Sequence, residues 1–208
     1  MGLLNLLLTD PIAFAFIAIP LMYAIIFHEL AHGYVAYRLG DPTAKLMGRL
    51  SLNPLKHLDP LGTLMLFLVG FGWAKPVPVN FRYIRDYRKG MILVSSAGII
   101  MNMILAFIAL FIYSLLNPDQ SGILALVLAV FAKINIVLAA FNLIPIPPLD
   151  GSKILSGFAP AGVQAALHRL ERFGFLIVIA LLYFGALDPV IDFLQRMILT
   201  LIGALLPA

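Results

Sequence analysis

Long apolar runs alternate along this chain with short polar connections. A helix needs about 20 residues to cross a bilayer, and three runs are long enough: 11–39, 91–116 and 123–143. The shorter runs 173–187 and 189–206 are further candidates, and Asp188-Pro189 marks a break between them. The pattern therefore predicts four or five membrane-crossing segments.

The apolar stretch 61–73 differs from these runs because it is too short to span. Its 13 residues would reach roughly 20 Å as a helix, against a hydrocarbon core of about 30 Å. Val77 and Val79 alternate with prolines, as in an edge strand, and 48–52 is a plausible partner strand. We therefore expect 48–81 to be a re-entrant, partly β loop, which is tolerated at membrane depth where it lines a cavity.

The composition supports a membrane protein. Of 208 residues, 62% are hydrophobic and only 12% are charged, whereas soluble domains are about half apolar and a quarter charged. We predict an all-α integral membrane protein, a polytopic helix bundle with a small re-entrant β element, forming one domain over 1–208. The net charge of +4 does not indicate nucleic acid as a partner. Because cysteine is absent, metal ligands are limited to His, Asp and Glu.

Basic residues predict the orientation in the cell membrane. Lys and Arg gather in the connections after the first run, before the second and after the third, whereas 117–122 and 185–192 carry none. Since cytoplasmic loops are enriched in Lys and Arg, we expect the N-terminus outside and the ends of the first and third runs at the cytoplasmic side.

The strongest chemical signal is His-Glu-Leu-Ala-His at 28–32, inside the first apolar run. On a helix, His28 and His32 lie one turn apart and about 40° apart around the axis, so both imidazoles can reach one metal ion. Glu29 then points beside the metal, as suits a general base acting on metal-bound water. The alternative is a surface helix that carries these residues by chance. Ionisable residues within a membrane helix are costly and usually functional, which favours the metal site.

A tetrahedral catalytic zinc needs a third protein ligand and one open position. Asp150 is the best candidate, because it follows the third run on the side where the first run also ends. Pro145, Pro147 and Pro148 precede it and prevent a regular helix, which bends the chain. The alternative is that Asp150 only caps a helix that begins at Gly151.

These residues resemble the site-2 proteases, the intramembrane zinc metalloproteases, in the short form that lacks an attached PDZ or CBS domain. The resemblance covers nearly the whole chain. Three elements match in order: His-Glu-Leu-Ala-His at 28–32, Gly98 with Asn102, and Asn142 with Pro145 and Leu-Asp-Gly at 149–151.

The resemblance implies one zinc ion per chain and cleavage of single-span membrane proteins within the bilayer. It also implies that Asn142 and Pro145 help to hold the substrate strand, with Asn102 as a further candidate whose alternative is helix–helix contact. A substrate helix must be unwound before its carbonyls can be attacked. The strand edge at Val77 and Val79 could then pair with it.

Other readings remain open. His57 is an alternative metal ligand, although fixing the loop or a hydrogen bond to a ligand suits it as well. Lys133 and Asn135 interrupt the third run; either they face a wet cavity, or Lys133 extends to the membrane surface. A catalytically silent module that binds membrane helices and a metal transporter are the rival functions. Neither needs Glu29 as a base beside the metal.

Overall fold

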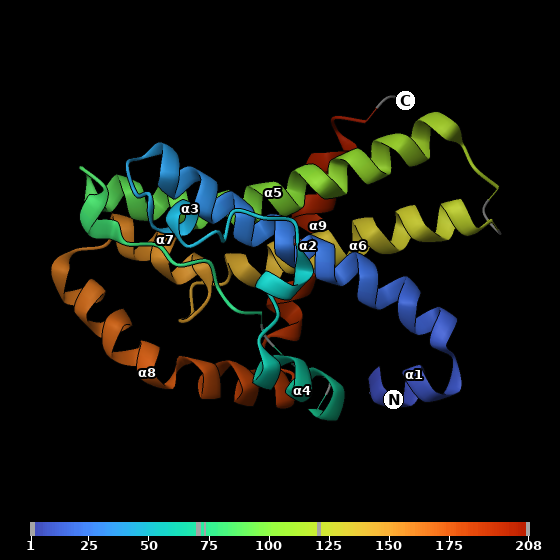
Figure 1. The fold of residues 1–208 in the computed structure, drawn as a ribbon, viewed down its shortest axis with the longest axis horizontal. Helices are drawn as coiled ribbons and strands as arrows, with labels where there is room; N and C mark the ends of the chain where they lie inside the picture. Colours follow the sequence, from blue (N-terminus) through green and yellow to red (C-terminus); the bar gives the residue numbers. More distant parts are fainter. Residues whose placement is uncertain (1–2, 70–71, 73, 120–121, 207–208) are drawn as a thin grey trace.

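The computed structural model describes residues 3–69, 72, 74–119 and 122–206. The described chain is helical apart from its connections (Figure 1). Its α-helices are α1 (Leu3–Thr9), α2 (Pro11–Arg38), α3 (Thr43–Leu46), α4 (Pro60–Val69), α5 (Tyr87–Leu116), α6 (Ile123–Leu143), α7 (Asp150–Phe158), α8 (Ala161–Tyr183) and α9 (Asp188–Gly203). Two single turns of 3-10 helix, Pro54–Lys56 and Phe81–Tyr83, lie in the connection between α3 and α5.

Three of these helices are long and apolar enough to cross a membrane: α2, α5 and α6. They are the three long runs of the sequence, so this part of the prediction is confirmed. Capping residues define where two of them begin. Asp10 accepts a hydrogen bond from the amide of Ala13 at the start of α2, and Asp86 accepts one from Lys89 at the start of α5.

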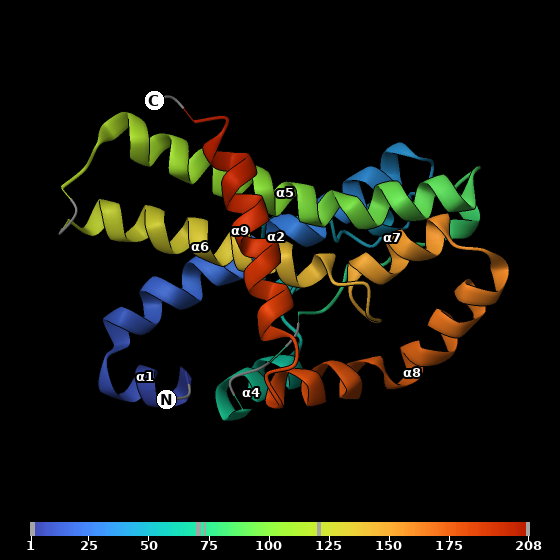
Figure 2. The ribbon, with the colours of Figure 1, turned by 180° about the vertical axis from the view of Figure 1, so that it is seen from behind.

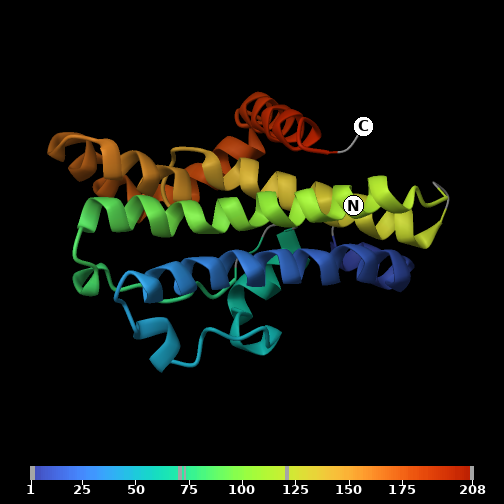
Figure 3. The ribbon, with the colours of Figure 1, turned by 90° about the horizontal axis from the view of Figure 1, so that it is seen from above.

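The three spans form the centre of the bundle. Helix α5 packs against both α2 and α6 along much of its length (Figure 3). Ala106 on α5 and Ala139 and Ala140 on α6 are almost completely buried at their contact. Small residues let membrane helices approach closely, which brings the polar side chains of different helices within reach of one another.

The two shorter runs form a bent pair rather than two separate spans. Helix α8 begins at Ala161 and ends at Tyr183, and α9 follows after a turn at an angle of 90°. Gly185 makes this turn with φ +68°, a conformation that suits glycine. In Figure 2, α9 crosses in front of α5 and α6. The pair counts as at most one further span, so the total is three or four.

The predicted β element is wrong. Among the described residues of 48–81, the pairing is a single antiparallel bridge between Leu58 and Ala74, with the Lys75 amide 2.8 Å from the His57 carbonyl. The predicted strand 48–52 does not pair with it, and Trp73 lies outside the described residues. Pro76 and Pro78 have no N–H to donate, and the amide of Val77 is bonded to a side chain of α2. Among the described residues, Pro76, Val77 and Pro78 therefore donate nothing to a ladder.

The apolar stretch within this loop folds as α4, which has 10 residues. A helix of that length reaches about 15 Å, half of a bilayer core, and α4 is not among the candidate spans. The described residues of 40–81 lie along one side of α2, and α9 lies on the other side of the bundle (Figure 3).

Candidate metal centre

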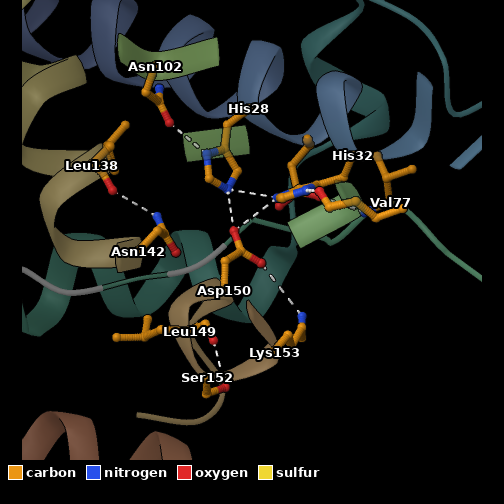
Figure 4. A network of polar contacts seen from close by, with 12 residues as sticks. His28, His32, Val77, Asn102, Leu138, Asn142, Leu149, Asp150, Ser152 and Lys153 are labelled. Atoms are coloured by element: carbon orange, nitrogen blue, oxygen red, sulfur yellow. Dashed lines mark hydrogen bonds and ion pairs between the residues drawn. The ribbon is translucent and has the colours of Figure 1, made fainter. Parts of the chain in front are cut away.

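Three ligand atoms from two distant parts of the chain meet inside the bundle. The Nε2 atoms of His28 and His32 lie 2.9 Å apart, and each lies 3.1 Å from Oδ2 of Asp150. All three residues are more than 90% buried, and among the described residues they form the one group of three such side chains. Figure 4 shows the two imidazoles and the carboxylate turned toward one another.

Local structure explains how Asp150 reaches the histidines. Helix α6 ends at Leu143, and the proline-rich turn leads directly into α7, whose first residue is Asp150. Gly151 packs against the carbonyl oxygens of Leu143 and Ile144, where a side chain would not fit. The chain therefore reverses tightly, and the carboxylate is placed beside α2.

Gly98 on α5 makes room for both imidazoles. A Cβ atom at this position would lie 2.5 Å from Cε1 of His28 and 2.5 Å from Nε2 of His32. Such distances are far below van der Waals contact. The absence of a side chain at Gly98 is therefore a condition for the close approach of the two rings.

The other nitrogen of each imidazole has a partner that accepts hydrogen bonds. Nδ1 of His32 lies 2.7 Å from the carbonyl oxygen of Val94, and Nδ1 of His28 lies 2.6 Å from Oδ1 of Asn102. Each Nδ1 must therefore carry the proton. In a neutral imidazole this leaves Nε2 with a lone pair.

The donor set fits a zinc ion. Two Nε2 lone pairs and a carboxylate oxygen face one another, an arrangement of three acceptors that a cation stabilises. Ligands about 2.0–2.1 Å from a tetrahedral zinc lie roughly 3.3 Å apart, and the three atoms here lie 2.9–3.1 Å apart.

Glu29 lies beside this group and is bound by the loop. Its Oε2 accepts a hydrogen bond of 2.7 Å from the amide of Val77. In the described part of the chain, no hydrogen bond engages its other oxygen. Glu29, both histidines and Asp150 all line one cavity of about 1170 Å³, whose walls are mostly apolar. The carboxylate is thus held at the edge of this cavity, next to the three ligand atoms.

The predicted substrate-binding residues fall into two groups in the structure: those that line the cavity and those that do not. Asn142, Val77 and Val79 line the cavity, and the amide nitrogen of Asn142 donates to the carbonyl of Leu138 on its own helix (Figure 4). Pro145 is exposed and is not among the described residues that line the cavity. Asn102 is completely buried and contacts His28 rather than the cavity.

His57 is not part of the ligand group. Its side chain is 2% exposed and its Nε2 lies 2.7 Å from the carbonyl oxygen of Ser51, so it ties the loop together. Its Nδ1 is buried, and no hydrogen-bond partner for it is found in the described chain. His57 lines the same cavity, but the metal group contains His28, His32 and Asp150 without it.

Sequence reasoning missed the roles of two residues. Lys153, one turn after Asp150 on α7, places Nζ 3.8 Å from Oδ1 of Asp150 and lines the cavity. Asn135 on α6 is completely buried and accepts a hydrogen bond of 2.8 Å from Asn102. The spacing of Asp150 and Lys153 could have indicated the first contact, whereas the pairing of Asn135 with Asn102 requires the relative placement of two helices.

Comparison with known proteins agrees with this geometry. Residues 118–185 match Peptidase family M50. "Putative zinc metalloprotease YwhC" of Bacillus subtilis is 44% identical over 80% of this chain and 79% of its own length. "Putative zinc metalloprotease Rip2" of Mycolicibacterium smegmatis is 30% identical over 80% of this chain and 66% of its own length.

A more distant relative is "Zinc metalloprotease MJ0392" of Methanocaldococcus jannaschii, 23% identical over 88% of this chain and 46% of its own length. No solved structure matches the chain significantly. The identity with the Bacillus protein extends over most of both chains. The chain therefore belongs to peptidase family M50, the site-2 proteases, and is a multi-pass membrane protein of a zinc metalloprotease family.

Proposed function

We propose that this protein is an intramembrane zinc endopeptidase that hydrolyses peptide bonds of single-span membrane proteins. One zinc ion per chain is held by His28, His32 and Asp150, and Glu29 is the general base. The observation that carries the proposal is the meeting of three unprotonated ligand atoms beside a carboxylate in the wall of an apolar cavity. Residues 1–208 act as one membrane-embedded domain on this proposal, since α2, α5, α6, α7, α8 and α9 all contribute to that cavity.

A zinc ion held by these three residues would polarise the substrate carbonyl and lower the pKa of the attacking water. Glu29 takes the proton of the attacking water and later delivers it to the leaving amine. The amide of Val77 holds one oxygen of this carboxylate, which leaves the other to exchange the proton. Asn102 and Val94 keep the protons of both imidazoles on Nδ1, so both Nε2 lone pairs are committed to the metal and Glu29 is left as the base.

The cavity also supports a role in holding an apolar substrate. A helical substrate keeps its carbonyls in its own hydrogen bonds and must be unwound before hydrolysis. Asn142 lies in the cavity wall with one hydrogen bond to Leu138, so its amide retains capacity to bind an unwound backbone. Apolar side chains around it, including Val79, provide a surface for the substrate side chains.

The distribution of basic residues supports a location in the cell membrane with the N-terminus outside and the active site toward the cytoplasm. His32 and Asp150 lie at the ends of α2 and α6–α7 that adjoin the basic connections. A single cysteine introduced at Asn117 should react with an impermeant maleimide added to intact cells, and one at Arg85 should react only after lysis. The opposite result would reverse the orientation.

The central experiment compares the purified protein with its Glu29→Gln variant on a panel of single-span substrates. Loss of a general base lowers rates by about 10²–10⁴-fold, while all three ligands remain. Cleavage should therefore fall by that factor and zinc content should not change. Glu171→Gln is the matched control, because Glu171 is half-exposed and pairs with His168 away from the centre.

Two outcomes would contradict the proposal. Binding of the substrates without cleavage by the unaltered, zinc-loaded protein would favour a silent module that holds membrane helices. Cleavage by the Glu29→Gln variant at the unaltered rate would remove Glu29 as the base.

A further inference from the structure

Two buried asparagines connect the metal centre to a third helix. Asn102 on α5 and Asn135 on α6 are both completely buried. Neither side chain is needed as a metal ligand, and neither is among the described residues that line the cavity. Buried amides are costly unless their donors and acceptors are paired, so the hydrogen bonds that they form decide what they do.

The donor and acceptor in each of these hydrogen bonds follow from the contact that lies farthest from His28, that of Asn135 with Phe131. Nδ2 of Asn135 donates to the carbonyl of Phe131 at 2.8 Å, which leaves Oδ1 to accept from Nδ2 of Asn102 at 2.8 Å. The same Nδ2 lies 3.3 Å from the carbonyl of Ala24 on α2. Oδ1 of Asn102 is then the atom that faces Nδ1 of His28, at 2.6 Å.

This direction matters because rotation of an asparagine side chain can exchange the positions of its oxygen and its nitrogen. If Asn102 were reversed, its Oδ1 would face the carbonyl of Ala24 and Oδ1 of Asn135, both of which are acceptors. Its Nδ2 would face His28, which would then need its proton on Nε2. That proton would occupy the lone pair that points at His32 and Asp150.

We propose that Asn135 is a positioning residue of the metal centre: through Asn102, it keeps the proton of His28 on Nδ1 and the lone pair of Nε2 directed at the metal. The inference rests on the proposed ligation of zinc by His28. Hydrogen bonds to the second nitrogen of a ligating histidine fix its tautomer and orientation. Here the fixing group lies one residue farther out, on a helix that carries no ligand.

The two histidines differ in this respect. His32 is held by a backbone carbonyl, that of Val94, and no substitution of a side chain removes that acceptor. His28 depends on the side chain of Asn102, whose orientation is held in turn by Asn135 at 2.8 Å and by the Ala24 carbonyl at 3.3 Å. Zinc affinity should therefore be sensitive to a change at Asn135, although that residue does not touch the imidazole.

The test measures the zinc dissociation constant of the purified full-length protein by competition with a chelator. Asn135→Leu keeps the branched skeleton of the side chain but removes the acceptor at 2.8 Å, which leaves only the Ala24 carbonyl at 3.3 Å to hold Asn102 against turning. Loss of an outer partner lowers metal affinity by about 10–100-fold, and we expect a loss of at least tenfold. Asn135→Asp, as a buried neutral acid, can donate to Phe131 and accept from Asn102, and should restore affinity close to that of the unaltered protein.

Ile136→Ala is the matched control for damaged packing. Ile136 is the next residue on α6, is 8% exposed and belongs to the main apolar cluster, but it has no link to His28. Its variant should unfold more easily and still bind zinc as tightly as before. Asn135→Ser, whose hydroxyl is too short to reach Asn102, provides a second variant if Asn135→Leu does not accumulate.

The outcomes separate the inference from the proposed function. If His28→Ala keeps its zinc affinity, the ligand set itself is wrong. If His28→Ala loses zinc but Asn135→Leu binds as tightly as Ile136→Ala, only the role of Asn135 is rejected. A second readout is the ¹⁵N spectrum of the His28 ring in the metal-free protein. It should report a proton on Nδ1 in the unaltered chain and a change of tautomer in Asn135→Leu.

Discussion

The cavity has two walls that are built differently. On the helical wall, α2, α5 and α7 present side chains: two imidazoles, a carboxylate and the space left by Gly98. On the loop wall, the described residues of 48–81 contribute backbone groups, such as the amide of Val77 that binds Glu29 and the carbonyl of His57 that binds Lys75. The proposed ligands are thus fixed by regular helices, whereas the proposed base is oriented by an irregular segment. The two walls should therefore respond differently to substitution.

The sharpest contrast is between Asp150 on the helical wall and His57 on the loop wall. Asp150→Ala removes one of three ligand atoms and should lower zinc affinity by more than the roughly 100-fold that loss of an outer partner can cause. His57→Ala should leave zinc bound, because His57 lies outside the ligand group. Metal analysis after dialysis measures both. A zinc-replete, active Asp150→Ala variant would reopen the assignment of His57 as a ligand.

The next effect concerns the space beneath the imidazoles. Gly98→Ala places a Cβ within 2.5 Å of both rings, and overpacking costs about 1–3 kcal/mol, or up to roughly 100-fold in an equilibrium constant. Zinc affinity and cleavage should fall together. Gly162→Ala on α8 is the control, since a Cβ there meets nothing within 4 Å. Equal behaviour of the two variants would show that the rings can move apart freely.

An intermediate effect is expected on the loop wall. Val77→Pro removes the N–H that binds Oε2 of Glu29, and a hydrogen bond to a charged group contributes about 1.5–3 kcal/mol. Cleavage should slow by about tenfold or more while zinc remains bound. Val77→Ala keeps the N–H and is the control. Loss of zinc from Val77→Pro with cleavage unchanged would make this wall part of the metal site.

The same variant separates two roles of the loop. If the amide of Val77 holds the base, helical and already extended substrates should lose the same factor. If the loop instead captured an unwound strand, the helical substrate would suffer more. The ratio of the two rates, measured in Val77→Pro and in the unaltered protein, decides between these roles, and we expect it to stay constant.

The smallest effect belongs to Lys153. Its Nζ lies 3.8 Å from Oδ1 of Asp150, but its side chain is 43% exposed. Exposed ion pairs contribute about 0.2–1 kcal/mol. Lys153→Met should therefore change zinc affinity by no more than about fivefold. A much larger loss of zinc affinity, measured by the same chelator competition, would mean that Lys153 holds Asp150 in its orientation.

The sequence predicts the helical wall far better than the loop wall. The spacing of His28 and His32 has a fixed meaning on a helix, and the long apolar runs predict α2, α5 and α6 as elements. The alternation of Val77 and Val79 with prolines has no such fixed meaning. It is compatible with an edge strand, but whether a ladder forms depends on what the free amide meets, and here it meets Glu29.

The pairing of Asn102 with Asn135 shows a second limit. Each asparagine alone is compatible with contact between helices, with a cavity or with a substrate. Their contact depends on the register in which α5 packs against α6, which the small residues Ala106 and Ala139 permit without specifying. The bend between α8 and α9 is likewise only partly predictable, because Asp188-Pro189 indicates a break in the helix but not the angle of 90°.

On the proposed function, the separation of His28 and Asp150 along the chain bears on when the metal centre can become active. His28 and Asp150 are 122 positions apart, so the ribosome completes Asp150 long after the helix that carries Glu29. At about 5–20 residues per second, that delay lasts on the order of ten seconds. With Asp150 as the third ligand, the growing chain passes through the translocation machinery without an assembled centre. The neighbouring nascent helices are then protected from hydrolysis until α7 has folded.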